Sequence, residues 1–183
     1  LMVEELPDSI KREVQIETVD LKQHTFHATL PKPSIIAFDK DGMTINELGI
    51  AINGGNIILA GNIQDTLNLQ LTMNALPAAL VNLWKSDLGV AGSVTGQVMI
   101  RGHLKKPDIT YDIKGEGLTT VAFQDKKIMP FSLSATGNTV NQNLTLNANL
   151  TGEGIQAQAQ GHVSLEKNAL DLHINLQNLS VRL

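Results

Sequence analysis

Aliphatic and uncharged polar residues alternate along much of the chain with a period of two. The pattern is clearest between residues 143 and 177, where leucine, isoleucine and alanine alternate with asparagine, glutamine and threonine. Because successive side chains of a β-strand point to opposite faces, this period places the aliphatic groups on one face of a sheet and the amides on the other. We therefore expect a sheet that withdraws only one of its faces from water.

The same alternation, bounded by turn residues, predicts strands along almost the whole chain. The expected strands are 12–21, 24–30, 34–38, 43–53, 56–64, 67–74, 93–104, 109–115, 118–124, 127–136, 143–151, 155–166 and 169–177. Short connections rich in glycine, asparagine, aspartate and lysine separate them. Connections this short make consecutive strands antiparallel neighbours, so the predicted topology is a long meander.

One segment, residues 76–86, departs from the period of two. Its apolar residues recur at helical spacing, at Leu76, Leu80, Leu83 and Trp84. Pro77 suits the first turn of a helix. We expect a short crossover helix near 77–86 that covers one region of the apolar face of the sheet.

Composition limits what else can cover that face. Aromatic residues make up only 3% of the chain, whereas sandwich cores of this size draw much of their packing from aromatic side chains. A meander of more than about ten strands tends to curl, and glycines at inward positions leave room for sharp bends. The inward glycines are Gly96, Gly102, Gly115 and Gly161. The predicted fold is all-β, a long antiparallel meander curled into an open hydrophobic trough. A closed β-sandwich with a structural or adhesive role, in which the aliphatic face is an ordinary core, is the alternative.

Several classes of function are disfavoured by the sequence. The net charge of −4 argues against nucleic acid as a partner, because nucleic acid requires a basic surface. The chain has no cysteine, no serine in a nucleophile elbow and no glycine-rich phosphate loop that leads into a helix. Its carboxylates are scattered among turns without a pair suited to acid–base work. We expect neither an enzyme nor a bound cofactor.

The histidines and one acidic turn are the candidate metal ligands of the chain. His24 and His27 lie three apart in an expected strand, so their side chains point to opposite faces, and His103, His162 and His173 are isolated. The residues from Asp39 to Gly42 are superficially similar to a calcium loop, but Ile50 stands where the terminal glutamate would be. We expect a hairpin turn at this place and no metal site.

The stretch from Leu71 to Gly117 carries a family signature. It reads LTMNALPAALVNLW at residues 71–84 and LGVAGSVTGQVMIRGHLKKPDITYDIKGEGL at residues 88–118. An L-P-x-x-L segment followed by L-G-x-x-G-x-x-x-G, a strand, a turn with Pro-Asp and an alternating strand resembles the TamB family. The wider AsmA-like group of inter-membrane lipid carriers is similar in pattern. The chain resembles a fragment from the C-terminal half of such a protein, and the resemblance covers most of its length.

This resemblance implies a trough of the kind called a β-taco, within a periplasmic protein that is anchored in the inner membrane of a Gram-negative bacterium. Members of the translocation and assembly module work with an outer-membrane partner barrel in assembling autotransporters and other outer-membrane proteins. They are also implicated in phospholipid transport between the membranes. The chain begins at Leu1-Met2-Val3 in mid-pattern and stops at Val181-Arg182-Leu183. We therefore interpret residues 1–183 as one β-trough segment excised from a longer protein.

The expected cargo is phospholipid acyl chains or unfolded outer-membrane proteins. A trough offers an apolar surface to the former, and its edge strands offer unpaired backbone groups to the latter. The open apolar face also favours self-association of the excised fragment. The predicted groove consists of aliphatic residues and one methionine at inward positions: Leu67, Leu69, Leu71, Met73, Val98, Ile100, Ile109, Ile113, Leu144, Leu146, Leu150, Ile155, Val163, Leu165, Leu170, Leu172, Ile174 and Leu176.

Overall fold

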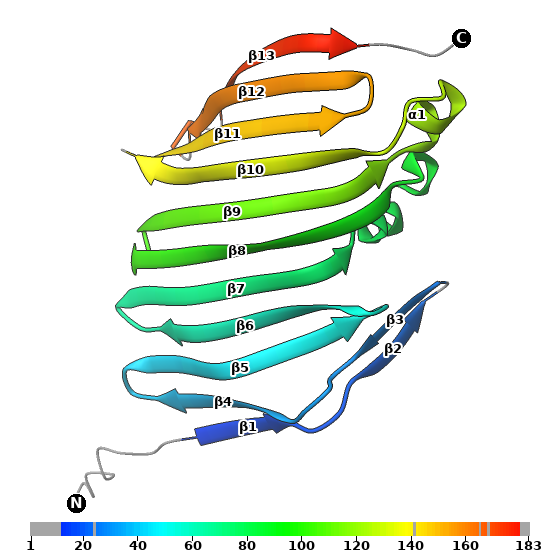
Figure 1. Ribbon diagram of the computed structural model, residues 1–183. Coiled ribbons are helices and arrows are strands. Elements are labelled where there is room, and N and C mark those ends of the chain that lie inside the picture. The colour runs from blue at the N-terminus through cyan, green and yellow to red at the C-terminus, as the bar shows by residue number, and fades with distance from the viewer. Residues whose placement is uncertain (1–11, 24, 141, 165, 168, 180–183) are drawn as a thin grey trace, which may run out of the picture.

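A computed structural model describes residues 12–23, 25–140, 142–164, 166–167 and 169–179 of the chain. In this part of the protein thirteen strands form one open sheet (Figure 1). The strands are β1 (Arg12–Ile16), β2 (Asp20–Gln23), β3 (Phe26–Thr29), β4 (Ser34–Asp39), β5 (Gly42–Ile52), β6 (Gly55–Ile63), β7 (Thr66–Pro77), β8 (Ala91–His103), β9 (Lys106–Thr119), β10 (Phe131–Val140), β11 (Asn143–Gly152), β12 (Ile155–Ser164) and β13 (Ala169–Leu179).

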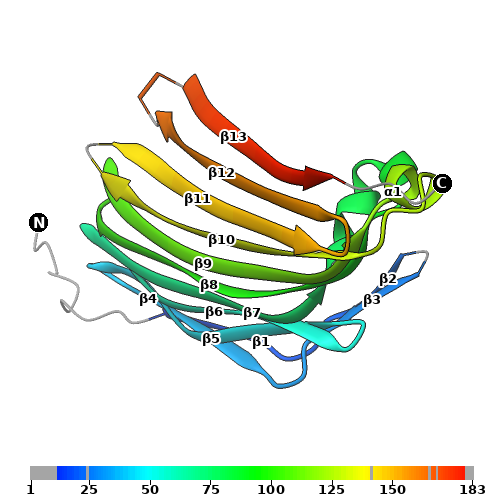
Figure 2. The ribbon, with the colours of Figure 1, turned by 45° about the horizontal axis from the view of Figure 1, so that its top comes forward.

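From β4 to β13 each strand pairs antiparallel with the next one in the chain. This ladder is the long meander that the turn residues predict, and the predicted fold class is confirmed. The sheet has no second layer among the described residues, so the closed sandwich is not the structure they form. Figure 2 shows the strands bowed along their length, which gives the sheet a concave and a convex face.

The first three strands depart from a simple meander. The expected strand 12–21 is wrong as one element, because β1 ends at Ile16 and β2 begins at Asp20. Whereas β1 pairs with β4, the β2–β3 hairpin pairs with the far end of β5, at Ala28 with Ile52. The sheet therefore divides at β5, where a register shift between Ile45 and Leu48 interrupts the ladder.

A buried hydroxyl stabilises this irregular region. Ser34 is 2% exposed, and its Oγ donates a hydrogen bond of 2.6 Å to the carbonyl oxygen of Glu47. Glu47 lies between the last regular pair before the register shift and the first pair after it. The serine therefore supplies a hydrogen-bond partner at the place where the strand ladder is interrupted.

The expected strand 118–124 is also wrong. Strand β9 continues only to Thr119, and residues Val121–Asp125 form the short helix α1. The Oγ1 atom of Thr120 accepts a hydrogen bond of 3.3 Å from the backbone N–H of Phe123. This contact is an N-cap, which satisfies one of the amide groups that a helix leaves unpaired at its start.

The helix expected near 77–86 is present as two short 3₁₀ helices, η1 (Ala78–Leu83) and η2 (Ser86–Leu88). The side chain of Asn82 bonds both backbone groups of Val90, at 2.8 Å and 2.9 Å, and so ties the connection to the start of β8. Trp84 is 84% exposed and does not cover the sheet as expected. In Figure 1 these helices and α1 gather at the same end of the strands.

Two of the inward glycines permit a close approach between strands. A Cβ at Gly96 would collide with the carbonyl oxygen of Asp112 on β9, and one at Gly161 would collide with that of Asp171 on β13. The other two expected bend positions differ. Gly102 has no atom nearer than 3.4 Å to its Cβ position, and Gly115 makes room for the side chain of Leu118.

Candidate hydrophobic cargo surface

Strand register brings the inward residues into rows that cross the sheet. One row begins with Met73 on β7, opposite Gly96 on β8, which is opposite Ile113 on β9. Further pairings extend the row over the next four strands, through Ala135, Ala148, Ala159 and Ile174. A parallel row joins Leu71, Val98 and Tyr111. The aliphatic face is therefore continuous from strand to strand.

The predicted groove residues lie on this one face, as far as the structure describes them. The pairs Leu69 with Ile100 and Ile100 with Ile109 cross the central strands. The pairs Leu144 with Val163 and Val163 with Leu170 cross the last three strands. Leu165 lies outside the described residues. The remaining predicted residues share the same alternate positions on their strands: Leu67, Leu146, Leu150, Ile155, Leu172 and Leu176.

The aliphatic face is the less exposed of the two. Along β9, the inward residues from Pro107 to Ile113 are half-buried, whereas the outward residues from Asp108 to Lys114 are exposed. Because the sheet is a single layer, we attribute this difference to its curvature, which places the aliphatic side chains on the concave side. The face remains accessible: the buried apolar residues among those described are only Ile45, Leu67, Ala78 and Ile155.

The apolar surface becomes more open toward β13. Leu170 and Ile174 are 64% and 68% exposed, because β13 is an edge strand with β12 as its one neighbour in the sheet. At this edge the trough presents both aliphatic side chains and a free strand to the surroundings.

The face also includes residues that the sequence reasoning left out of the groove. Ile57 and Leu59 on β6 lie opposite Met73 and Leu71, and Ile36 on β4 lies opposite Ile45 on β5. The sequence predicts all three of these strands, and their aliphatic residues were the available signal. The register shift in β5 changes which residues of the strand point inward. The alternation of inward and outward side chains is therefore broken between Ile45 and Leu48.

Tyr111 supplies the one phenol of the chain to this face. Its hydroxyl donates a hydrogen bond of 2.9 Å to the carbonyl oxygen of Thr145, which lies on β11, beyond β10. The ring crosses β10 at Gly137, where a Cβ would lie 2.6 Å from the phenol oxygen. Burial raises the pKa of Tyr111 above its ordinary value of 10.0.

This shift gives a prediction for high pH. Because the folded state holds the phenol proton more tightly than the unfolded state does, the stabilisation is complete below pH 10 and is lost as the pH rises through the folded pKa. An absorbance titration at 295 nm reports this single tyrosine, and its midpoint should lie above 10.0 in the native protein. The same titration in denaturant is the control. Equal midpoints in the two conditions would contradict the burial of the phenol.

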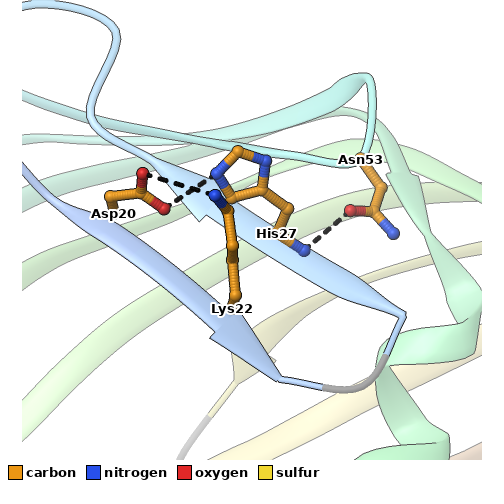
Figure 3. A network of polar contacts seen from close by, with 4 residues as sticks. All are labelled: Asp20, Lys22, His27 and Asn53. Atoms are coloured by element: carbon orange, nitrogen blue, oxygen red, sulfur yellow. Dashed lines mark hydrogen bonds and ion pairs between the residues drawn. The ribbon is translucent and has the colours of Figure 1, made fainter.

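Among the candidate metal ligands, His27 takes part in local polar contacts. His27 Nε2 lies 2.9 Å from Asp20 Oδ1, Lys22 Nζ lies 3.8 Å from Asp20 Oδ2, and the backbone N–H of His27 donates to Asn53 Oδ1 at 2.9 Å (Figure 3). The two contacts of Asp20 lie within the β2–β3 hairpin, and the bond to Asn53 joins the hairpin to the turn after β5. His24 lies outside the described residues, which hold no group of three or more potential ligands.

The acidic turn from Asp39 to Gly42 connects β4 and β5. Its Asp39 Oδ1 accepts hydrogen bonds from the backbone N–H groups of Asp41 and Gly42, at 2.9 Å and 3.0 Å. This is the side-chain-to-backbone pattern of an aspartate that initiates a turn. The hairpin turn expected here is confirmed.

Comparison of the chain with protein-family models, with curated proteins and with solved structures found no match. Within the described residues, no helix has both the length and the apolar character needed to span a membrane.

Proposed function

We propose that this chain is a segment of a hydrophobic conduit that shields phospholipid acyl chains from water on their way between two membranes. The observation that carries the proposal is the aliphatic face, which continues across the strands of one open sheet and which no second layer covers in the part of the chain that the structure describes. A closed core needs such a layer, whereas a surface for apolar cargo needs this face to remain accessible.

The energetics favour a continuous surface of this kind. Each methylene group that leaves water gains about 0.8 kcal/mol. An acyl chain of about sixteen carbons therefore faces a barrier on the order of 13 kcal/mol to cross open water. Rows of leucine, isoleucine and valine offset most of this barrier without a specific pocket, and such interchangeable side chains suit sliding better than tight capture.

The resemblance to the TamB family supports a cellular setting for the proposal. The conduit then lies in the periplasm, as part of a protein anchored in the inner membrane, and works with a partner barrel in the outer membrane. In this setting the conduit contributes to outer-membrane biogenesis through lipid supply, through assembly of outer-membrane proteins, or through both.

Two neighbouring residues of β11 provide a direct test. Leu146 lies on the aliphatic face, and Asn147 lies on the opposite face. A photo-crosslinking residue at Leu146 of the full-length protein should label phospholipid in cells, and the same residue at Asn147 should not. Equal labelling at the two positions, or no labelling at Leu146, would contradict the conduit.

Among the described strands β13 pairs with β12 alone, and this edge favours a second function, the escort of unfolded outer-membrane proteins by strand addition. The strand runs from Ala169 to Leu179, contains no proline, and carries Asp171 as its one charged residue apart from His173. Such an edge is a template for an incoming strand. Proline at positions whose N–H groups point away from β12 should abolish escort and leave lipid labelling at Leu146 unchanged. If the proline variants lost both escort and lipid labelling, the edge strand would not have a function separate from that of the aliphatic face.

A further inference from the structure

The two long connections at one end of the strands carry exposed apolar side chains. Residues 78–90 connect β7 to β8, and residues 120–130 connect β9 to β10. Together they present the lip patch, a set of large apolar residues that are each at least 40% exposed: Val81, Leu83, Trp84, Val121 and Met129. Two further turns at this end, Asn53-Gly54 and Glu153-Gly154, are short and contain no large apolar residue.

The lip patch is one surface and not two separate loops. Helix α1 contacts η2, and η2 contacts η1. The contact is close enough that a Cβ at Gly89 would collide with the side chain of Val121. Figures 1 and 2 agree in placing the three helices side by side beyond the ends of the central strands.

Charge distinguishes the lip patch from the rest of the chain. The two connections hold Lys85, Lys126 and Lys127 against Asp87 and Asp125, so that they are net positive. The whole chain has a net charge of −4. The lysines therefore adjoin the exposed apolar residues on a protein that is otherwise acidic.

We propose that the lip patch docks on the surface of an anionic phospholipid bilayer, with Trp84 at the level of the headgroups. Tryptophan is enriched at this interface because its ring is apolar and its N–H remains hydrated. Lysines beside it reach anionic headgroups through their long apolar stems. A protein partner fits the patch less well, because lysine is depleted in protein interfaces.

This docking would place one rim of the sheet, where the strands end, against a membrane surface. It is a property of the two connections and their side chains, and it does not require that the aliphatic face carry cargo.

The single tryptophan reports the docking directly. The emission of Trp84 should shift to shorter wavelength when the chain is mixed with vesicles of phosphatidylglycerol and phosphatidylethanolamine, and high salt should reduce the shift. Vesicles of phosphatidylcholine alone should give a smaller shift. An emission spectrum that anionic vesicles leave unchanged would overturn the proposal.

Two matched sets of charge reversals distinguish vesicle binding through the lip patch from general electrostatic attraction of the chain to the vesicles. The variant K85E/K126E/K127E should partition to anionic vesicles at least about a hundredfold more weakly, since each lysine near such a surface contributes about fivefold. The control K105E/K106E/K167E has the same change in charge at the opposite end of the strands and should partition much more strongly than the first variant. Equal losses in the two triple variants would overturn the proposal.

The apolar contribution is tested by L83S/M129S, which replaces two exposed side chains and should keep the far-UV circular dichroism of the parent. This variant should also bind vesicles more weakly, and unchanged binding would show that the patch does not enter the interface. Lipid labelling at Leu146 is a separate measurement. It can therefore fail while vesicle binding persists, or the reverse, so the failures of the two proposals are distinguishable.

Discussion

Replacing Gly96 with alanine should lower the free energy of unfolding by about 3 kcal/mol, a large effect for one methyl group. The added Cβ would collide with the carbonyl oxygen of Asp112 and lie 2.8 Å from the Cα atom of Ile113. Both obstacles are backbone atoms of β9, so no side-chain rotation relieves them. The two strands would have to separate at a point where they are hydrogen-bonded neighbours. Chemical denaturation monitored by circular dichroism measures the change.

Gly49 offers a matched control for this substitution. It also lies within a strand, β5, where it is buried, whereas Gly96 is half-buried, and the nearest atom to its Cβ position is a side-chain carbon of Ile58 at 3.9 Å. That is an ordinary van der Waals distance, and Gly49→Ala should be neutral or should stabilise the fold by up to about 1 kcal/mol through the unfolded state. If Gly96→Ala were tolerated as well as Gly49→Ala, the close approach of β8 and β9 would be wrong.

The period of two predicts most of this sheet because the local and the long-range signals agree from β7 onward. Short polar turns fix which strands are neighbours, and alternation fixes which face each side chain takes. The prediction fails where one local feature overrides the pattern. The segment from Leu118 to Phe123 is rich in residues that favour strands, but the Thr120 cap starts a helix there.

The residues of the candidate cargo surface could be predicted from the sequence about as well as the strands could. The aliphatic positions from Leu67 to Leu176 could be assigned to one face because alternation is regular in those strands. The position of Trp84 could not be assigned in this way. Its spacing with Leu80 favoured a helix that packs on the sheet, whereas the connection forms two 3₁₀ helices at the end of the strands and leaves the indole exposed. The exposure of a side chain in such a connection depends on where the connection packs against the strands. The spacing of apolar residues in the sequence does not indicate that position.

Replacing Val98 with aspartate should reduce the phospholipid carried by the full-length protein by more than about tenfold. Val98 lies between Leu71 and Tyr111 in the middle of the sheet, on the aliphatic face. A carboxylate there retains its hydration shell, and an acyl chain that passes it loses contact over about two methylene groups. At about 0.8 kcal/mol for each methylene, the loss corresponds to the expected reduction. Quantification of phospholipid that co-purifies with the protein, per mole of protein, measures the effect.

Met99 provides the control, because it is the next residue of β8 and lies on the convex face, between Gln70 and Thr110. Met99→Asp introduces the same charge into the same strand and also removes an apolar side chain. It should leave the bound phospholipid within about twofold of the parent, since a carboxylate on a hydrated face displaces no cargo. A thermal unfolding curve for each variant shows whether the fold persists. If both variants fold and lose lipid equally, charge and not the aliphatic face governs binding. If both fold and neither loses lipid, the cargo does not pass over Val98, and the conduit proposed here is wrong.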